Sequence, residues 1–245
     1  MTLPAKAFQR WLHGVAPETS TADVCRVSGI KRTTLAQQLV RGKVSVTTVV
    51  SISRAYGINP VSALADFDAY RELADPQPPP TRCELVSQIS TADLLQAMLT
   101  RQAMDPKRKA GAEPPDLSPA PHATSVKNWV DAIDDGEVRH RVSAATGIAP
   151  QNYSAQLTAN RLTAELAVAT ARAAGVALTG GLVATGLVTE EEAGWAPGAR
   201  CAALDSLSDG DLAVLAGDRL QAMGKVLRRQ EQDQAQTEKI WENLG

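Results

Sequence analysis

Residues 28–64 read SGIKRTTLAQQLVRGKVSVTTVVSISRAYGINPVSAL, and this stretch decides the fold. Apolar residues recur in it every three or four positions between glycines, which predicts short helices joined by tight turns. One helix is expected over about 32–40, with Leu35 and Leu39 buried, and it stops before Gly42. A further helix begins after Ser45, whose hydroxyl suits the cap of a helix N-terminus.

Helices are also expected on both sides of this stretch. Upstream, an apolar stripe with helical spacing begins at Phe8, and Ser20 with Asp23 forms a capping box before a helix that runs to Ser28. Gly29 then supplies the turn into the helix over 32–40. Downstream, Asn59 and Pro60 have the residue types that open a fifth helix. The sequence therefore predicts a five-helix bundle that contains a helix-turn-helix.

The same pattern returns 118 positions later. At this shift Trp11 meets Trp129, Gly29 meets Gly147 and Leu39 meets Leu157. Large residues and turn glycines that coincide in one register indicate a small helical unit built twice in one chain.

We expect an all-α fold with two helix-turn-helix domains. The expected boundaries are 1–70 for the first domain, 71–123 for a connecting helix and a Pro-rich linker, and 124–245 for the second domain. Residues 105–123, rich in proline and charge, are expected to be extended. A long final helix is expected from Ser208, with these apolar residues facing inward: Leu212, Leu215, Leu220, Met223 and Leu227.

Composition and charge favour a soluble protein with a basic first domain. Hydrophobic residues make up 44% of the 245 residues, and the net charge is −2. Residues 1–65 nevertheless hold eight Lys and Arg residues against Glu18 and Asp23. Residues 188–245 hold eleven acidic residues against six basic ones. Such a local excess of positive charge favours an anionic partner.

Several classes of protein are not expected. No apolar run approaches the roughly 18 residues of a membrane span, and the N-terminus lacks the apolar core of a secretory signal. Three distant cysteines suit neither a disulfide framework nor a zinc site, so we expect a reducing cytoplasm. No catalytic motif, metal site or cofactor-binding loop is present in the sequence, so we expect no enzymatic activity and no cofactor.

The exposed face of the helix over 32–40 is expected to enter the major groove of double-stranded DNA. Arg32 and Gln37 have the chemistry for bidentate contacts, Arg to guanine and Gln to adenine. Cationic residues nearby suit phosphates. No acidic residue stands between Val24 and Ala65, which is unusual for an ordinary solvated helix face. The expected DNA contacts are Lys31, Arg32, Thr33, Thr34, Gln37, Gln38, Arg41 and Lys43.

The corresponding helix of the second domain starts at Pro150 and carries amides instead of cations. Gln151 and Asn152 are candidate adenine readers, and Tyr153, which stands where Leu35 does, is expected in the core. A purely structural role for this electrically neutral domain is the alternative. The expected DNA contacts are Gln151, Asn152, Ser154, Gln156, Asn160 and Arg161.

The two expected reading helices differ in their exposed side chains. A repressor dimer reads a palindrome because its two helices are identical. Two different readers in one chain predict a non-palindromic site that is bound by a monomer, with tethering in place of dimerisation.

The stretch 28–64 resembles the lambda-repressor-like helix-turn-helix family, with the turn glycine and the buried leucine pair in place. Its loop between Leu39 and Gly42 is one residue longer than the commonest pattern. The layout of the whole chain resembles the immunity repressors of actinobacterial temperate phages of the mycobacteriophage cluster A type. That resemblance implies binding to asymmetric operator and stoperator sites, silencing of lytic genes, lysogeny and superinfection immunity, in the cytoplasm of a bacterial host.

Two other functions are compatible with the sequence. One is a protein-interaction adaptor whose helical modules hold peptides. The other is an antitoxin-like regulator whose second domain binds a protein. The dependence of affinity on salt separates both from a DNA-binding protein.

Overall fold

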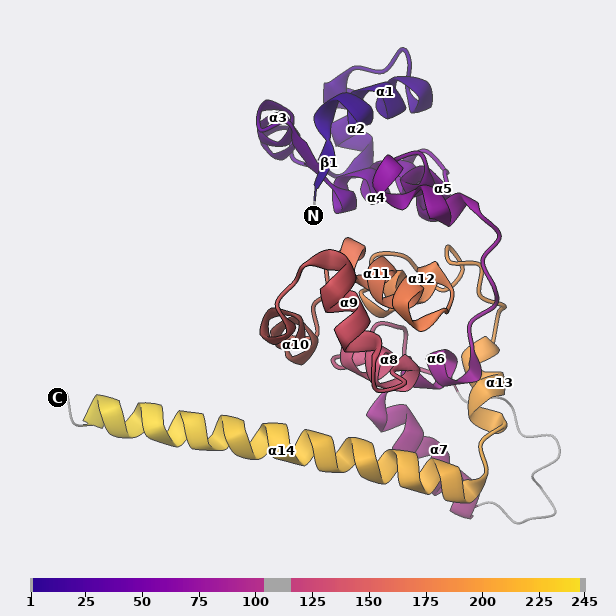
Figure 1. The fold of residues 1–245 in the computed structure, drawn as a ribbon, viewed down its shortest axis with the longest axis vertical. Helices are drawn as coiled ribbons and strands as arrows, with labels where there is room; N and C mark the ends of the chain where they lie inside the picture. Colours follow the sequence, from indigo (N-terminus) through magenta and orange to yellow (C-terminus); the bar gives the residue numbers. More distant parts are fainter. Residues whose placement is uncertain (1, 104–115, 243–245) are drawn as a thin grey trace. The chain divides into compact units, whose positions relative to one another are not determined.

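The computed structural model describes residues 2–103 and 116–242, and these residues are mostly helical (Figure 1). The expectation of an all-α fold is confirmed. Contacts group the chain into a larger unit, residues 1–88 and 119–199, and a smaller unit, residues 89–118 and 200–245. No helix in the described ranges has the length and apolar character needed to cross a membrane.

The larger unit begins with a first repeat of five helices. The hydroxyls of Ser20 and Ser45 accept the amides of Asp23 and Thr48, and thereby cap the second and fourth helices. Asn59 Oδ1 accepts the amide of Val61 at the start of the fifth. The helices are α1 (Ala5–Val15), α2 (Thr21–Ser28), α3 (Arg32–Val40), α4 (Val46–Ala55) and α5 (Pro60–Ala65).

A short antiparallel strand pair, which the sequence did not indicate, ties the N-terminal end to the loop after α3. Strand β1 (Thr2–Pro4) pairs with β2 (Lys43–Ser45). Leu3 and Val44 face one another in the pair and are both buried. The pair therefore closes the bundle beside the C-terminal end of α3.

The second repeat follows the first at the shift of 118 positions. Its α10 and α11 begin at residues that correspond to the first residues of α3 and α4. Side-chain bonds recur as well: Ser28 Oγ donates to the Val24 carbonyl, and Thr146 Oγ1 donates to the Val142 carbonyl. The helices are α8 (Ser125–Ile133), α9 (Val138–Thr146), α10 (Pro150–Thr158), α11 (Ala164–Ala174) and α12 (Leu178–Ala184).

Between the repeats, the 3-10 helix η1 (Asp68–Ala74) and helix α6 (Arg82–Ser87) belong to the larger unit. The carboxylate of Glu84 is fully buried, accepts hydrogen bonds from Thr81 at the start of α6, and accepts the Trp129 indole N–H at 3.2 Å. This bond joins α6 to α8, so the segment is packed structure and not a spacer.

The second half of the expected linker is also packed. Residues 104–115 lie outside the described range. At 116–123 the chain is held by specific bonds: Ser118 donates to Asp93, the His122 ring contacts the Ser87 carbonyl at 3.0 Å, and the His122 amide donates to Ser125 Oγ. Residues 116–123 contain no helix or strand, but their polar groups bond to neighbouring elements, so this part of the linker is packed and not a free spacer.

The smaller unit contains α7 (Thr91–Ala103), α13 (Ala199–Asp205) from residue 200 onward, and α14 (Asp209–Glu242). Leu94, Leu204 and Leu212 form its buried core, and the Arg101 guanidinium donates to the Leu204 and Leu207 carbonyls. These contacts group the final helix with α7, whereas the sequence placed it in the second domain. Of its expected inward residues Leu212 is buried, but the side chains of Leu220, Met223 and Leu227 are exposed.

Candidate nucleic-acid interface

The first repeat contains a helix-turn-helix built from α2 and α3. Gly29 has φ 70°, and its amide donates to the Cys25 carbonyl, which ends α2. This left-handed conformation costs glycine nothing and turns the chain directly into α3. Val24 on α2 and Leu35 on α3 are fully buried, so the inner faces of the two helices are fixed in the bundle core.

The outer face of α3 is exposed over most of its length. In the described part of the chain, no side chain forms a hydrogen bond or ion pair with the four cations Lys31, Arg32, Arg41 and Lys43. The first turn of α3 carries no acidic residue. The positive N-terminal end of α3 therefore acts in the same direction as Lys31 and Arg32, toward an anion, while Arg41 and Lys43 lie beyond the other end of the helix. The exposed members of the expected set are Lys31, Arg32, Thr33, Thr34, Gln37, Arg41 and Lys43.

Gln38 has a different role from its neighbours. It is half-buried, and its Oε1 accepts the Ser45 amide at 3.0 Å and the Thr48 hydroxyl at 3.0 Å. These bonds connect α3 to β2 and the first turn of α4. We therefore assign Gln38 a positioning role in place of the expected DNA contact.

In the second repeat, α10 presents Gln151, Asn152 and Ser154 to solvent, and Gln156 is half-buried. Tyr153 is buried, as expected from its match to Leu35, and its hydroxyl lies 2.7 Å from Thr170 Oγ1. Burial raises the pKa of the Tyr153 phenol, while the Thr170 bond acts in the opposite direction. Tyr153 is thus a core residue that fixes α10 against α11.

Asn160 also serves the fold. It is the one residue other than glycine with positive φ in the described ranges, at 51°. Its Oδ1 accepts the Val126 amide at 2.8 Å, and its Nδ2 donates to the His122 carbonyl. Both bonds hold the start of α8. We therefore assign Asn160 a positioning role in place of the expected phosphate contact. Arg161, next in the chain, is exposed.

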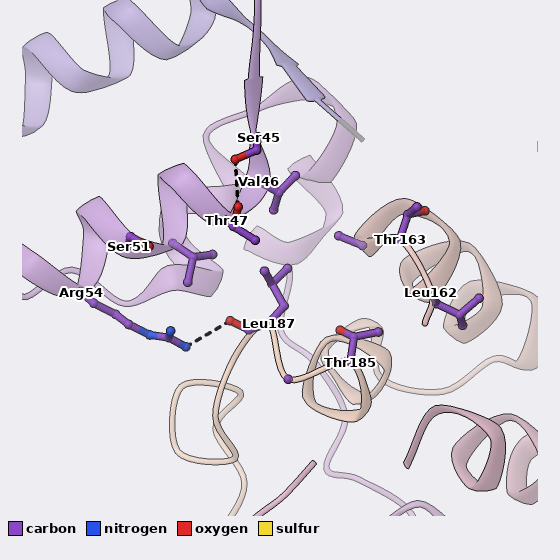
Figure 2. Close-up of a pocket in the computed structure, with 12 residues that line it drawn as sticks. Ser45, Val46, Thr47, Ser51, Arg54, Leu162, Thr163, Thr185 and Leu187 are labelled. Carbon is purple, nitrogen blue, oxygen red and sulfur yellow. Dashed lines mark hydrogen bonds between the residues drawn. The ribbon is translucent and has the colours of Figure 1, made fainter. Parts of the chain in front are cut away.

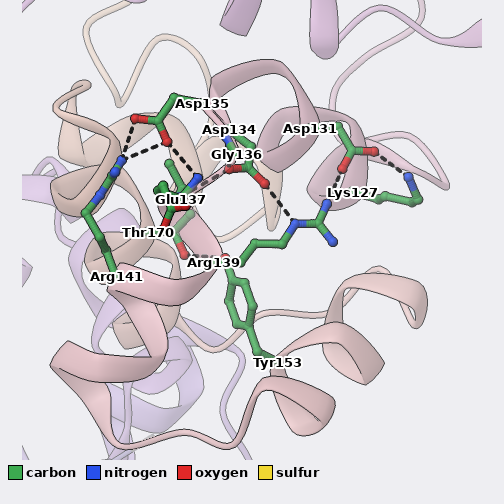
Figure 3. A network of polar contacts seen from close by, with 11 residues as sticks. Lys127, Asp131, Asp134, Asp135, Gly136, Glu137, Arg139, Arg141, Tyr153 and Thr170 are labelled. Carbon is green, nitrogen blue, oxygen red and sulfur yellow. Dashed lines mark hydrogen bonds and ion pairs between the residues drawn. The ribbon is translucent and has the colours of Figure 1, made fainter.

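Three cations of the second repeat, in contrast to those at α3, are paired with acidic residues of the same repeat (Figure 3). Lys127 pairs with Asp131, Arg139 pairs with Asp131 and Asp134, and Arg141 pairs with Asp135. The Arg141 bond is the main cause that lowers the pKa of the Asp135 carboxyl. The same network builds the turn before α9, because Asp134 Oδ1 accepts the amides of Gly136 and Val138.

A cavity of about 520 Å³ lies inside the larger unit, between the start of α4 and the start of α11 (Figure 2). Ser45, Thr47 and Arg54 line it from the first repeat, and Leu162 and Thr163 from the second. Arg54 and its partner Glu192 were not singled out from the sequence as an interacting pair. A contact over 138 positions leaves no periodic signal in the sequence.

Comparison of the chain with known protein families, with curated proteins and with solved structures found no match. The described residues contain no group of three or more His, Cys, Asp or Glu side chains that could hold a metal ion.

Proposed function

We propose that this chain is a sequence-specific DNA-binding repressor that binds a duplex as a monomer through two different helix-turn-helix units. The observation that carries the proposal is the exposed face of α3, where Lys31, Arg32, Arg41 and Lys43 on and beside the helix form no ion pair within the described ranges. A helix fits the major groove, and its polar side chains then reach base edges while the flanking cations reach phosphates.

The two units contribute different chemistry to this function. The first attracts the backbone through Lys31, Arg41 and Lys43 and reads bases with Arg32 and Gln37. The second, whose cations are largely paired internally, reads with the amides of Gln151 and Asn152. Covalent linkage raises the local concentration of the second unit, so even a weak reader tightens binding.

The resemblance to actinobacteriophage immunity repressors adds the biological part of the proposal. On that basis the sites are operator and stoperator sequences, and their occupancy silences lytic genes and maintains lysogeny and superinfection immunity in the host cytoplasm.

The test is the salt dependence of binding of the full chain to a labelled duplex, measured by fluorescence polarisation. About six phosphate contacts give a log–log slope near −5, whereas a peptide adaptor or a protein-neutralising regulator shows little salt dependence with its partner. The variant Lys43→Ala should reduce the slope by about 1, and Lys225→Ala, an exposed cation on α14, should leave it unchanged. A slope near zero for the full chain refutes the proposal.

A further inference from the structure

Each repeat forms hydrogen bonds with the segment that follows the other repeat. In the first repeat, the Arg54 guanidinium donates to both carboxylate oxygens of Glu192, at 2.6 and 2.7 Å, and to the Leu187 carbonyl at 3.1 Å. Asn59 Nδ2 donates to the Glu192 carbonyl at 3.0 Å. Helix α4 and the start of α5 are thus bound by the segment that follows the second repeat.

The reverse set of contacts is also present. Arg172, which corresponds to Arg54 at the shift of 118 positions, donates to Glu72 at 2.8 Å. The Leu178 amide, at the start of α12, donates to Gln77 Oε1 at 2.9 Å. Helix α11 and the start of α12 are bound by the segment that follows the first repeat. Glu192 stands two positions beyond the match of Glu72, so the correspondence is close but not perfect.

Reciprocity of this kind distinguishes two ways of joining a repeated unit. When copies are related by a twofold axis, residue i of one copy contacts residue j of the other, and j contacts i. When copies are related by translation, two different surfaces meet and the contacts are not exchanged. The pairs Arg54–Glu192 and Arg172–Glu72 follow the first pattern.

The cavity shows where such an axis passes. Its lining includes Ser45 and Val46 from the first repeat and their matches Thr163 and Ala164 from the second (Figure 2). Ser45 and Thr163 cap α4 and α11 in the same way. Equivalent segments lie across one space, and this occurs beside a twofold axis.

We propose that the repeats are related by an approximate twofold axis, and that the chain therefore reads two inverted half-sites of different sequence. This inference rests on the proposed function. Helix α3 precedes Ser45 and helix α10 precedes Thr163, so the two helices are equivalent under this axis. With the axis perpendicular to the duplex, a twofold rotation makes equivalent helices run in opposite directions along it. The site is then symmetric in its backbone and asymmetric in its bases, and a single chain does what a repressor dimer does. On B-form DNA the half-site centres lie about one helical turn apart.

The experiment determines the direction in which each helix reads. Binding sites are selected from random duplex DNA with the full chain and with four variants of exposed residues. On α3 these are Arg32→Ala, near its start, and Gln37→Ala, near its end; on α10 they are Gln151→Ala and Ser154→Ala. Each variant relaxes base preference at the position that the lost side chain read. The order from start to end of α3 should run opposite to that of α10 along the duplex.

Synthetic duplexes complete the test. With both half-sites in the selected arrangement, binding should be at least about tenfold tighter than with one half-site reversed, because reversal removes the second reader. Hydroxyl-radical protection should be mirror-symmetric about the centre, with one chain per duplex in sedimentation. The same reading order for both helices, α10 variants that change no base preference, or two chains per duplex would overturn the twofold proposal. Loss of all sequence preference in the full chain would refute the proposed function as well.

Discussion

Gly42 and Asn160 occupy the same position in the two repeats and share a left-handed backbone, with φ of 69° and 51°. Glycine adopts this conformation without steric cost, and asparagine is among the few L residues that tolerate it. The turns after α3 and α10 therefore have the same backbone conformation. The second repeat gains two bonds to the start of α8, which glycine cannot make.

Replacement of Asn160 separates these two effects. Asn160→Gly keeps the backbone relaxed but removes the acceptor of the Val126 amide, and it should cost about 1–2 kcal/mol of unfolding free energy. Asn160→Ala adds left-handed strain and should cost about 1 kcal/mol more. Urea unfolding followed by circular dichroism measures both. Equal stability of Asn160→Ala and the wild type contradicts the structural role.

Gln37 and Gln38 form a natural pair of test and control on α3. Gln38→Ala leaves the Ser45 amide and the Thr48 hydroxyl without their acceptor and should cost about 1–2 kcal/mol of stability. Gln37→Ala removes an exposed side chain and should change stability by less than about 0.5 kcal/mol. On DNA, Gln37→Ala should lower base discrimination at one position. The opposite ranking of the two variants in urea unfolding would exclude the positioning role of Gln38.

The helices of both repeats could be predicted from the sequence, because their signals are local. Capping residues such as Ser20 and Ser45, and turn glycines such as Gly29, act within a few positions of the chain. The alignment of Trp11 with Trp129 then allowed the helices of the second repeat to be predicted from those of the first. Helix α10 begins at Pro150, as predicted.

The remainder depends on contacts between distant residues. The exposed position of Gln38 on a helical wheel gave no sign of its bonds to Ser45 and Thr48, because β2 was not predicted. The reciprocal ion pairs of Arg54 and Arg172 could not be predicted from the sequence either. The opposite directions proposed for α3 and α10 rest on these pairs and were therefore also not predicted. For α14, the stripe that begins at Leu212 predicted burial along the helix, yet α7 covers only its first turns.

Arg32 and Lys43 should differ in what they contribute to binding. Arg32→Ala removes the proposed bidentate base contact, so it should cost about 1–3 kcal/mol on the selected site and relax preference at one base pair. Lys43→Ala removes the proposed phosphate contact and should weaken selected and random duplexes by the same factor. Competition binding at fixed salt measures the ratio for each variant. Equal losses on both duplexes for Arg32→Ala would show that Arg32 does not read a base.

Gly181 and Gly14 predict opposite effects of the same substitution. A Cβ at Gly181 would lie 2.7 Å from Trp129 Cη2 and 2.9 Å from the Ala167 carbonyl, both buried. Gly181→Ala should therefore destabilise the larger unit by about 1–3 kcal/mol. Gly14, on α1, has nothing within 4 Å of such an atom, so Gly14→Ala should stabilise by about 0.5–1 kcal/mol through helix propensity. Thermal unfolding that ranks both variants alike would disprove the close packing around Trp129.

The ion pair of Arg54 and Glu192 should make stability depend on pH in a defined direction. The bond from Arg54 is the main cause that lowers the pKa of the Glu192 carboxyl below its ordinary value of 4.5. The unfolded chain thus takes up this proton first as the pH falls. The stabilisation is complete at neutral pH and is lost as the pH falls below 4.5 through the folded-state pKa. Because Arg54 is partly exposed, the effect should not exceed about 1 kcal/mol.

The variant Glu192→Gln tests this pH dependence. Its stability should be lower than that of the wild type at pH 7 and equal to it once the wild-type carboxyl is protonated in both the folded and the unfolded state. The control Glu191→Gln, at an exposed neighbour, should have the stability of the wild type at every pH. Urea midpoints between pH 3 and pH 7 measure the difference, and a constant gap between wild type and Glu192→Gln over that range would show that the carboxylate charge is not what joins the repeats.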